Sequence, residues 1–507
     1  MKARVLMVQG TGSHVGKSVV VTALCRIFRQ DGFRVAPFKA QNMSLNSYVT
    51  PDGGEIGRAQ AVQAEAAGIE PTVEMNPILL KPEADSRSQV VLLGRPLLSA
   101  AARDYYGLRP SLWSAVTEAL DTLRSEYEVV IIEGAGSPAE VNLKEVEIAN
   151  MRVARYSDAP VLLVGDIDRG GVFASLLGTL GLLEPEERAL IKALVINKFR
   201  GDLSLLEPGL RFLQTRAGIP VAGVIPYFHD IRIAQEDSVT LEQSRPQERD
   251  AQMDIAVIKL PHISNFDDFD PLEQEGGVAL RYVNAVEDLS TPSLVILPGS
   301  KATVADLDWL TESGLAGKIA ELYQRGVFII GICGGYQMLG RRIQDPEHVE
   351  SLASERQGLG LLPVTTAFSP SKETHRVRGR VSAGWGLLAE AQGIPFEGYE
   401  IHMGRTESQG NRATFQIHER SGQPCDVHDG CLDDSGRVLG TYIHGLFHNQ
   451  GLRRAILRHI AVSKGAFLDF PGDDVRRDEE YNRLAELVRH SLDMNLIYGI
   501  AGLGVGR

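Results

Sequence analysis

The 507-residue chain is long enough for roughly three domains and for a sizeable buried core. Its 52 lysines and arginines are outnumbered by 65 aspartates and glutamates, and the formal charge of −13 argues against a broad nucleic-acid-binding surface. The sequence has four cysteines and no C-x-x-C pair, which is too little for a disulfide scaffold and makes a zinc site unexpected. Because we find neither a secretory leader nor an 18-residue apolar run, we expect a cytoplasmic protein without a membrane partner.

Short apolar runs alternate with longer segments through the first half of the chain. The runs expected to form strands are Arg4–Val8, Arg34–Phe38, Val129–Ile132, Val161–Val164, Ala193–Ile196 and Ala222–Ile225. Their nearly continuous apolar character is typical of strands buried on both faces, and the long segments between them indicate crossover helices. The pattern predicts an α/β fold with a doubly wound parallel sheet.

A second α/β series occupies the other half of the chain. Between the two series, the polar stretch at 235–252 has no apolar period, and we interpret it as an interdomain linker rather than an exposed loop within one domain. After about residue 360 the pattern becomes glycine-rich and strand-like. The strands expected in this half are Ile255–Leu260, Leu294–Leu297, Val327–Ile332 and Val438–Ile443.

The end of the chain has apolar residues at helical spacing in Leu452–Ile460 and Tyr481–Leu492. We expect these helices to pack against the second domain. The predicted organisation is therefore a first domain at 1–234, a linker at 235–252, a second domain at 253–450 and a helical tail at 451–507.

The segment GTGSHVGKS directly follows the first expected strand and opens a helical stretch, which is the setting of a phosphate-binding loop. Backbone N–H groups and the helix N-terminus attract an anion there. Lys17 is expected to contact the β- and γ-phosphates, and the Ser18 hydroxyl to bind Mg²⁺. The loop is a variant, because the strict pattern has glycine where this chain has Thr11. The expected nucleotide-binding residues in this loop are Gly10, Thr11, Gly12, Val15, Gly16, Lys17 and Ser18.

Three later strands also lead into polar residues. Glu133 and Asp166 are expected to bind Mg²⁺ or water, and Asn197 to recognise the nucleotide base. The alternative for each is a capping or turn residue, since Asp and Asn favour such positions. Asp52 and Glu55 are weaker candidates for Mg²⁺ or water contacts, with a solvated turn as the alternative.

A cysteine follows the strand that ends near residue 332. The sequence Gly331–Gly335, GICGG, predicts a sharp turn that exposes the Cys333 thiol at the start of a helix. The backbone N–H groups of Gly334 and Gly299 are expected to stabilise an oxyanion. His444, at the end of another expected strand, is the candidate base. The alternative is that Cys333 is a small buried apolar residue.

The remaining cysteines and a second histidine have weaker contexts. Cys25 falls inside the first expected helix, and Cys425 and Cys431 fall in a polar region, so we interpret all three as non-catalytic. His402 is interpreted as structural or substrate-facing.

Both domains resemble known families. The phosphate loop is similar to that of dethiobiotin synthetase and its relatives, which activate a carboxylate with ATP. The second domain resembles class I glutamine amidotransferases, in which the cysteine releases ammonia from glutamine through a γ-glutamyl thioester. That resemblance implies that Gln337 helps to hold glutamine. This chain departs from the family in having Leu446 where an acid usually orients the histidine, so another group must orient His444 or it works without one.

The chain as a whole resembles the cobyric acid synthase family. The segments that carry the resemblance are Lys39–Ser47, Asp52–Gln60, Met75–Pro82, Gly165–Gly171 and Asn197–Asp202. The resemblance implies amidation of the b, d, e and g carboxylates of adenosylcobyrinic acid a,c-diamide, with ATP, Mg²⁺ and glutamine. The oligomeric state is left open.

The sequence also allows three alternatives. One is cobyrinic acid a,c-diamide synthase, or another ATP-dependent amidoligase, which would amidate other carboxylates. A second is a regulatory ATPase switch with a degenerate second domain, and the third, a DNA-binding ATPase, is disfavoured by the charge of −13. The basic segment Arg376–Arg380 either attracts an anionic substrate or is a solvated strand face, and the second interpretation is favoured.

Overall fold

The structure is a computed structural model of the whole chain. It describes residues 2–504 apart from 85–86, 102–104, 106, 108, 229–230, 232, 234–250, 409–412, 469 and 471–476. The expected linker at 235–252 therefore lies outside the described residues except for its last two positions. In the described part of the chain, no helix has both the length and the apolar character needed to cross a membrane.

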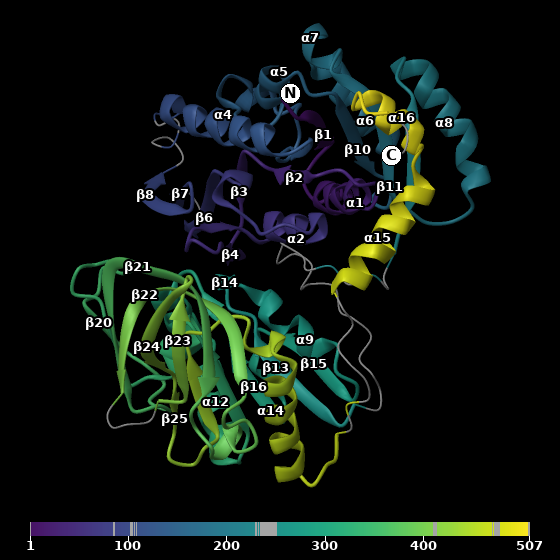
Figure 1. The fold of residues 1–507 in the computed structure, drawn as a ribbon. Coiled ribbons are helices and arrows are strands. Elements are labelled where there is room, and N and C mark those ends of the chain that lie inside the picture. The colour runs from purple at the N-terminus through teal and green to yellow at the C-terminus, as the bar shows by residue number, and fades with distance from the viewer. Residues whose placement is uncertain are drawn as a thin grey trace.

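The first domain is built on a six-stranded parallel sheet in the order β12-β11-β10-β1-β9-β2 (Figure 1). The predicted strands are all present, with boundaries shifted by up to three residues: β1 (Arg4–Gly10), β2 (Val35–Phe38), β9 (Val129–Glu133), β10 (Val161–Asp166), β11 (Ile191–Phe199) and β12 (Val221–Pro226). The helices of this domain are α1 (Lys17–Gln30), α2 (Arg58–Ala67), α4 (Arg109–Glu126), α5 (Met151–Ser157), α6 (Val172–Leu182), α7 (Pro185–Arg188) and α8 (Leu203–Ala217).

Helices cover both faces of this sheet. In β1, Met7 packs in the apolar core shared with α4, α5, α6 and α8. Its neighbours Leu6 and Val8 point the other way, into a core shared with α1. Because alternate residues of a strand face opposite sides, this double burial explains why the strands read as continuous apolar runs. The predicted doubly wound α/β arrangement is confirmed.

A small β-rich segment between β2 and α4 was not predicted. It forms a four-stranded sheet in the order β3-β6-β7-β8 and a separate two-stranded hairpin, β4-β5. Its elements are β3 (Gln41–Met43), β4 (Ser47–Val49), β5 (Glu55–Gly57), a short 3₁₀ turn (Val73–Met75), β6 (Ile78–Ala84), β7 (Arg87–Leu92) and β8 (Arg95–Ala101). The strands of the hairpin are too short and too polar to give a periodic signal.

The second domain has a six-stranded sheet in the order β15-β13-β16-β18-β26-β25, parallel except for β25. Its strands are β13 (Met253–Ile258), β15 (Val278–Val283), β16 (Leu294–Leu297), β18 (Phe328–Ile332), β25 (Cys431–Leu432) and β26 (Val438–Thr441). Its helices are α9 (Asp270–Glu273), α10 (Val286–Leu289), α11 (Thr303–Glu312), α12 (Leu315–Gln324), α13 (Gly334–Leu339) and α14 (Gln450–Ser463), with 3₁₀ turns η4 (Phe266–Phe269), η5 (Gly386–Leu388) and η6 (Leu446–His448).

The strand-like region after residue 360 forms a second sheet, largely antiparallel, beside the first. Its strands are β19 (Arg342–Gln344), β20 (Glu355–Gln357), β21 (Val364–Val381), β22 (Pro395–Ser408), β23 (Phe415–Arg420) and β24 (Gln423–Asp429). A two-stranded antiparallel pair, β14 (Ile263–Ser264) with β17 (Gly299–Ser300), lies next to the domain interface.

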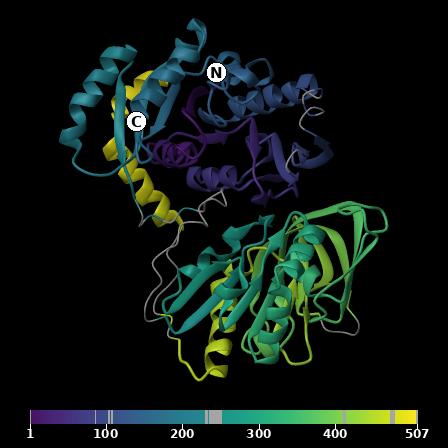
Figure 2. The same cartoon turned by 180° about the vertical axis from the view of Figure 1, so that it is seen from behind.

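The helical tail divides between the two domains, so the expectation that it packs on the second domain is wrong for its last two helices. α14 belongs to the core of the second domain. α15 (Arg477–Ser491) and α16 (Met494–Ile500) instead bury Leu484, Val488 and Tyr498 in the core beside α1. Both views show these yellow helices on the first domain (Figures 1 and 2). Helical spacing identifies an apolar face but does not say which surface covers it.

Charged side chains are buried where the hairpin β4-β5 and α2 meet the second domain. Arg58 Nε lies 2.9 Å from Asp267 Oδ2, with both side chains at most 3% exposed. Glu55, fully buried, pairs with Lys81 of its own domain at 2.6 Å and with Lys372 of β21. A buried ion stripped of its partner is costly, so these pairs fix how the two domains meet.

We predict that Leu484→Ala destabilises the first domain. The side chain is fully buried, so the substitution should lower the free energy of unfolding by roughly 2–5 kcal/mol. Hydrogen exchange should show faster exchange in α1, while α14 stays protected. Glu486→Ala, on the exposed side of α15, is the control and should change stability by less than about 0.5 kcal/mol. Loss of protection confined to α14 would contradict this placement of the tail.

Two candidate active sites

The phosphate loop joins β1 to α1 at the carboxyl edge of the first sheet. A Cβ on Gly10 would lie 2.4 Å from Val15 Cγ2, so this position needs glycine. Gly16 has a φ of 101° and packs against Asn197, whose Nδ2 would be 2.1 Å from a Cβ there. The loop therefore turns tightly enough for α1 to begin at Lys17, with its N-terminus facing the loop.

Lys17 lies over this loop. Its ammonium group donates hydrogen bonds to the carbonyl oxygens of Gly12 (2.8 Å) and Gly136 (3.0 Å). Gly136 follows β9, so the lysine joins the phosphate loop to the turn after Glu133. This is where a cation can meet the phosphates of a nucleotide bound by the loop.

Glu133, at the end of β9, accepts hydrogen bonds from three side chains. Its Oε1 accepts hydrogen bonds from Ser18 Oγ and Lys39 Nζ, both at 2.8 Å, and its Oε2 accepts from Gln63 Nε2 at 2.5 Å. Burial alone raises the pKa of Glu133, but the charge of Lys39 and these three hydrogen bonds lower it below its usual value. The carboxylate is therefore ionised at neutral pH.

Ser18 and Glu133 fit a magnesium site. Their oxygens are 2.8 Å apart, and hydroxyl and carboxylate oxygens are the hard donors that Mg²⁺ prefers. Among the described residues, no group of three or more acidic, histidine or cysteine side chains is placed to hold a metal. The remaining ligands would be phosphate oxygens and water, as is usual for Mg²⁺ at nucleotide sites.

Asn197 and Asp166 lie beside the phosphate loop and help to hold it. Asn197 Nδ2 donates to the carbonyl of Val15 at 2.9 Å and is almost fully buried. Lys198 donates to both Asp166 Oδ2 (2.8 Å) and the carbonyl of His14 (2.7 Å). Asn197 therefore holds the phosphate loop directly, and Asp166 holds it through Lys198. Base recognition by Asn197 stays a prediction.

The structure does not bring Asp52 and Glu55 to the phosphate loop. Asp52 accepts a hydrogen bond from Thr50 inside the exposed turn between β4 and β5, beside residues of the second domain. Glu55 forms ion pairs with Lys81 and Lys372 at the interface. These carboxylates lie on the insertion that was not predicted. For Asp52 the contacts agree with the alternative of a solvated turn, whereas Glu55 is buried in ion pairs.

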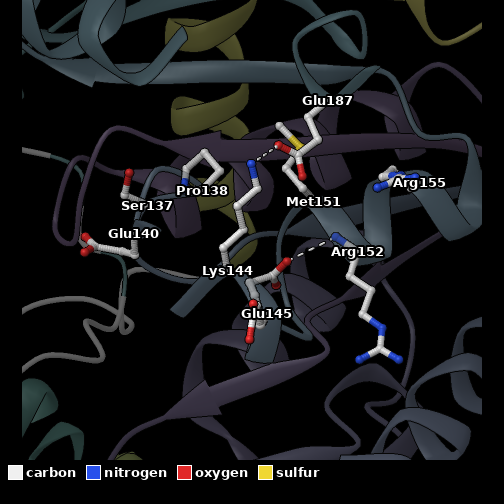
Figure 3. A pocket seen from close by; sticks show the side chains of 10 residues that line it. Ser137, Pro138, Glu140, Lys144, Glu145, Met151, Arg152, Arg155 and Glu187 are labelled. Carbon is white, nitrogen blue, oxygen red and sulfur yellow. Dashed lines mark hydrogen bonds and ion pairs between the residues drawn. The ribbon is translucent and has the colours of Figure 1, made fainter. Parts of the chain in front are cut away.

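A pocket of about 380 Å³ opens beside the turn after β9 (Figure 3). Its charged lining residues are Lys144, Arg152, Arg155, Glu140, Glu145, Glu147 and Glu187. Lys144 is paired with Glu187 at 3.1 Å, as Figure 3 shows. With four carboxylates against three cations, this pocket does not favour an anionic substrate.

Cys333 occupies the predicted sharp turn between β18 and α13. Its backbone has φ 51° and ψ −107°, a conformation that a non-glycine residue adopts at a cost. The turn needs small neighbours: a Cβ on Gly335 would lie 2.0 Å from the carbonyl oxygen of Leu297. The thiol donates a hydrogen bond to the carbonyl of Ile401 at 3.3 Å. Strain of this kind is typical of a nucleophile held for reaction.

His444 is oriented by an acid that the sequence did not reveal. Its Nδ1–H donates to Asp268 Oδ2 at 2.7 Å, and the backbone N–H of Gly445 donates to Asp268 Oδ1 at 2.7 Å. Burial lowers the pKa of His444, but the charge and hydrogen bond of Asp268 and the contact with Cys333 raise it to about 10. Asp268 thus fills the position left open by Leu446. Cys333, His444 and Asp268 are arranged as a nucleophile, a base and an orienting group would be, and the catalytic roles of Cys333 and His444 stay a prediction.

The predicted oxyanion residues flank this group. A Cβ on Gly299 would lie 3.0 Å from His444 Cε1, and one on Gly334 would lie 2.9 Å from the backbone nitrogen of Ser300. Gly299 pairs with Ser264 in the β14–β17 ladder. Both glycines therefore lie close to the Cys333–His444 group, and an oxyanion role for their N–H groups stays a prediction.

Gln337 and His402 belong to a buried polar network. The Gln337 amide accepts from Thr303 at 3.2 Å and donates to Tyr442 at 3.1 Å. His402 stacks on Tyr442 at 3.8 Å and donates from Nδ1 to the carbonyl of Gly404. Burial lowers the pKa of His402 to about 4, so the ring is neutral.

The three arginines of the basic segment Arg376–Arg380 contact neighbouring groups. Arg376 pairs with Glu70 at 2.9 Å, and Arg378 pairs with Glu397 at 3.0 Å. Arg380 donates to the carbonyl of Gly393. The contacts of Arg378 and Arg380 agree with the solvated strand face that the alternation of the segment favoured, whereas Arg376 pairs with the first domain.

Known proteins match both halves of the chain. Residues 6–241 match the family model described as the CobQ/CobB/MinD/ParA nucleotide binding domain. Residues 254–452 match the CobB/CobQ-like glutamine amidotransferase domain. The protein named cobyric acid synthase from Dehalococcoides mccartyi (strain CBDB1) is 52% identical over 503 residues, covering 99% of this chain and all of the relative. The chain belongs to the cobyric acid synthase family.

Two further members of the family are equally similar. The cobyric acid synthases of Moorella thermoacetica (strain ATCC 39073 / JCM 9320) and Sorangium cellulosum (strain So ce56) are 54% and 53% identical, and each alignment covers 99% of this chain and at least 98% of the relative. Among solved structures, that of PurLQS from Thermotoga maritima is 20% identical, with a TM-score of 0.32 over 41% of this chain and 99% of that one. A likeness at that level carries no functional argument.

Membership of this family establishes the class of activity. The chain is an enzyme, a glutamine-hydrolysing amidoligase of cobalamin biosynthesis. Its nucleotide-binding domain implies the use of ATP, its amidotransferase domain implies glutamine as the ammonia donor, and the family implies a corrinoid substrate. The alternative of a regulatory ATPase switch with a degenerate second domain is therefore excluded.

We predict that Asp268→Asn impairs glutamine hydrolysis through the orientation of His444. The turnover number should fall by roughly 10²–10⁴-fold, the range that general acid–base catalysis contributes. Loss of the carboxylate charge also lowers the pKa of His444, so the protonated ring that must protonate the leaving ammonia is lost at a lower pH. The alkaline limb of kcat against pH should therefore move to lower pH. An unchanged profile in a folded variant would contradict the assignment.

Proposed function

We propose that the chain amidates the b, d, e and g carboxylates of adenosylcobyrinic acid a,c-diamide to give adenosylcobyric acid. ATP would activate each carboxylate in the first domain, and glutamine would supply ammonia in the second. The observation that supports this most is the presence, in one chain, of a phosphate loop with Lys17 and of a Cys333–His444–Asp268 arrangement. The full-length similarity to proteins named cobyric acid synthase supports the substrate.

The first domain would make the carboxylate reactive. A carboxylate resists attack because it is negatively charged and has no good leaving group. Transfer of the γ-phosphoryl group from ATP to a carboxylate oxygen breaks the bond to the β-phosphate, releases ADP and gives an acyl phosphate. Lys17 would bind the phosphates, while Ser18 and Glu133 would hold Mg²⁺, which neutralises phosphate charge when bound.

The second domain would release ammonia. The Cys333 thiolate attacks the side-chain amide carbon of glutamine, and the N–H groups of Gly334 and Gly299 would stabilise the oxyanion. His444, held by Asp268, takes the thiol proton and passes it to the leaving nitrogen. Water then cleaves the γ-glutamyl thioester to glutamate. The ammonia attacks the acyl phosphate in the first domain, where phosphate leaves and the amide forms.

The alternative substrate assignment is that of cobyrinic acid a,c-diamide synthase. That enzyme would share both domains and both chemical steps. The segments Gln41–Ser47 and Asn76–Pro82, together with the full-length relatives, favour cobyric acid synthesis. The two reactions give products that differ in the number and position of amides.

We predict four successive exchanges of a carboxyl hydroxyl for an amine when the enzyme meets ATP, Mg²⁺, glutamine and adenosylcobyrinic acid a,c-diamide. Mass spectrometry over time should resolve the intermediates. Cobyrinic acid without amides is the matched comparison, because the alternative enzyme would use it and stop after two. No mass change while glutamine is being hydrolysed would overturn the substrate assignment.

We predict that Cys333→Ala and Lys17→Met separate the two half-reactions. Cys333→Ala should abolish amidation from glutamine but retain amidation from an added ammonium salt, because the acyl phosphate can still form. Lys17→Met should abolish amidation from both nitrogen sources, because its ammonium group is lost from the phosphate loop. Product formation from each source is the measurement. Full glutamine-dependent activity in Cys333→Ala would contradict the nucleophile assignment.

A further inference from the structure

The loop that carries Asp268 is held by the other domain. Asn265 Oδ1 accepts a hydrogen bond from the backbone of Ser47 at 3.0 Å, and the backbone of Phe266 donates to Asn46 Oδ1 at 3.3 Å. Next along the chain, Asp267 forms its ion pair with Arg58. Each of the three residues before Asp268 therefore contacts the ATP-binding domain, while Asp268 itself faces His444.

The ion pair between Arg58 and Asp267 is buried directly beside Asp268 in the chain. Its N···O distance is 2.9 Å, and the exposed fractions of the two side chains are 3% and 2%. Burial raises the pKa of Asp267, the charge of Arg58 opposes that rise, and the adjacent Asp268 carboxylate adds to it. Arg58 thus neutralises one of two neighbouring buried carboxylates, which would otherwise repel each other.

A second set of contacts runs from Arg58 toward His444. The guanidinium lies over the ring of Tyr48, 5.2 Å from its centroid. Tyr48 packs against Tyr399 at 6.0 Å, and Tyr399 stacks on the His444 ring at 5.1 Å with an interplanar angle of 13°. The imidazole is therefore bounded on one side by Asp268 and on one face by Tyr399. Arg58 contacts Asp267, which precedes Asp268, and Tyr48, which packs against Tyr399.

We propose that Arg58 is a positioning residue for glutamine hydrolysis, which completes the Cys333 site across the domain interface by holding the loop that carries Asp268. This rests on the proposed role of Cys333, His444 and Asp268. Arg58 does not touch the thiol, so it acts through Asp267 and Tyr48. The amidotransferase domain is therefore incomplete without the β4-β5 hairpin and α2 of the first domain.

The test is the glutaminase activity of full-length Arg58→Met, measured without the corrinoid. We expect kcat to fall by roughly 10- to 10²-fold, the cost of a small misplacement of catalytic groups, with KM nearly unchanged because no glutamine contact is removed. Arg58→Lys keeps the charge without the planar fork and should lie between the wild type and Arg58→Met. Glu70→Gln, which removes the exposed interdomain pair with Arg376, is the control and should keep the wild-type kcat.

A double variant separates positioning from stability. In Arg58→Met, Asp267 is left as an uncompensated buried carboxylate beside Asp268. Adding Asp267→Asn removes that charge, so the double variant should recover part of the lost kcat, which makes the two substitutions non-additive. This variant also keeps the test usable if Arg58→Met does not fold. Folded Arg58→Met or Arg58→Met/Asp267→Asn with the wild-type kcat, KM and pH profile would overturn the proposal. Absence of glutaminase activity in the wild type would instead overturn the proposed function.

Discussion

The pairing of buried charges between the two domains is the constraint on which both sites depend. Arg58 faces Asp267, and Glu55 lies between Lys81 and Lys372, all with little or no exposure. Each of these ions would cost several kcal/mol if it were buried without its partner. The domains therefore meet in one arrangement, and that arrangement places the loop before Asp268 against α2. The same helix reaches the nucleotide site, since Gln63 donates to Glu133, which accepts from Ser18 of the phosphate loop.

Both sites present their reactive group at the same kind of junction between a strand and a helix. In each domain a buried parallel strand ends in a glycine-rich turn that leads into a helix, so backbone N–H groups and one side chain face the edge of the sheet. Both turns use a positive φ, which is 101° at Gly16, where glycine adopts it readily, and 51° at Cys333, where a non-glycine residue is strained. Asn197 supports the first turn, and the close approach of Gly335 to Leu297 supports the second.

Much of the architecture was predictable because its signals are local. Continuous apolar runs located the strands of the first sheet, and the flanking glycines located the two turns with Lys17 and Cys333. The insertion β3–β8 was not predicted, and its three-residue strands, such as Ser47–Val49, carry no period. The tail was misplaced because an apolar helix face, such as that of Leu484 and Val488, fits any apolar surface equally well in sequence terms.

The sequence by itself determined which chemistry this protein carries, because a phosphate loop, a cysteine turn and a histidine after a strand are each written in a few adjacent residues. The tertiary structure alone decided how those groups are held. Asp268 lies 176 residues before His444, and Arg58 comes from another domain, so no local pattern connects them. Contacts between distant segments are fixed by packing and by the cost of burying charge, neither of which is encoded within one short segment.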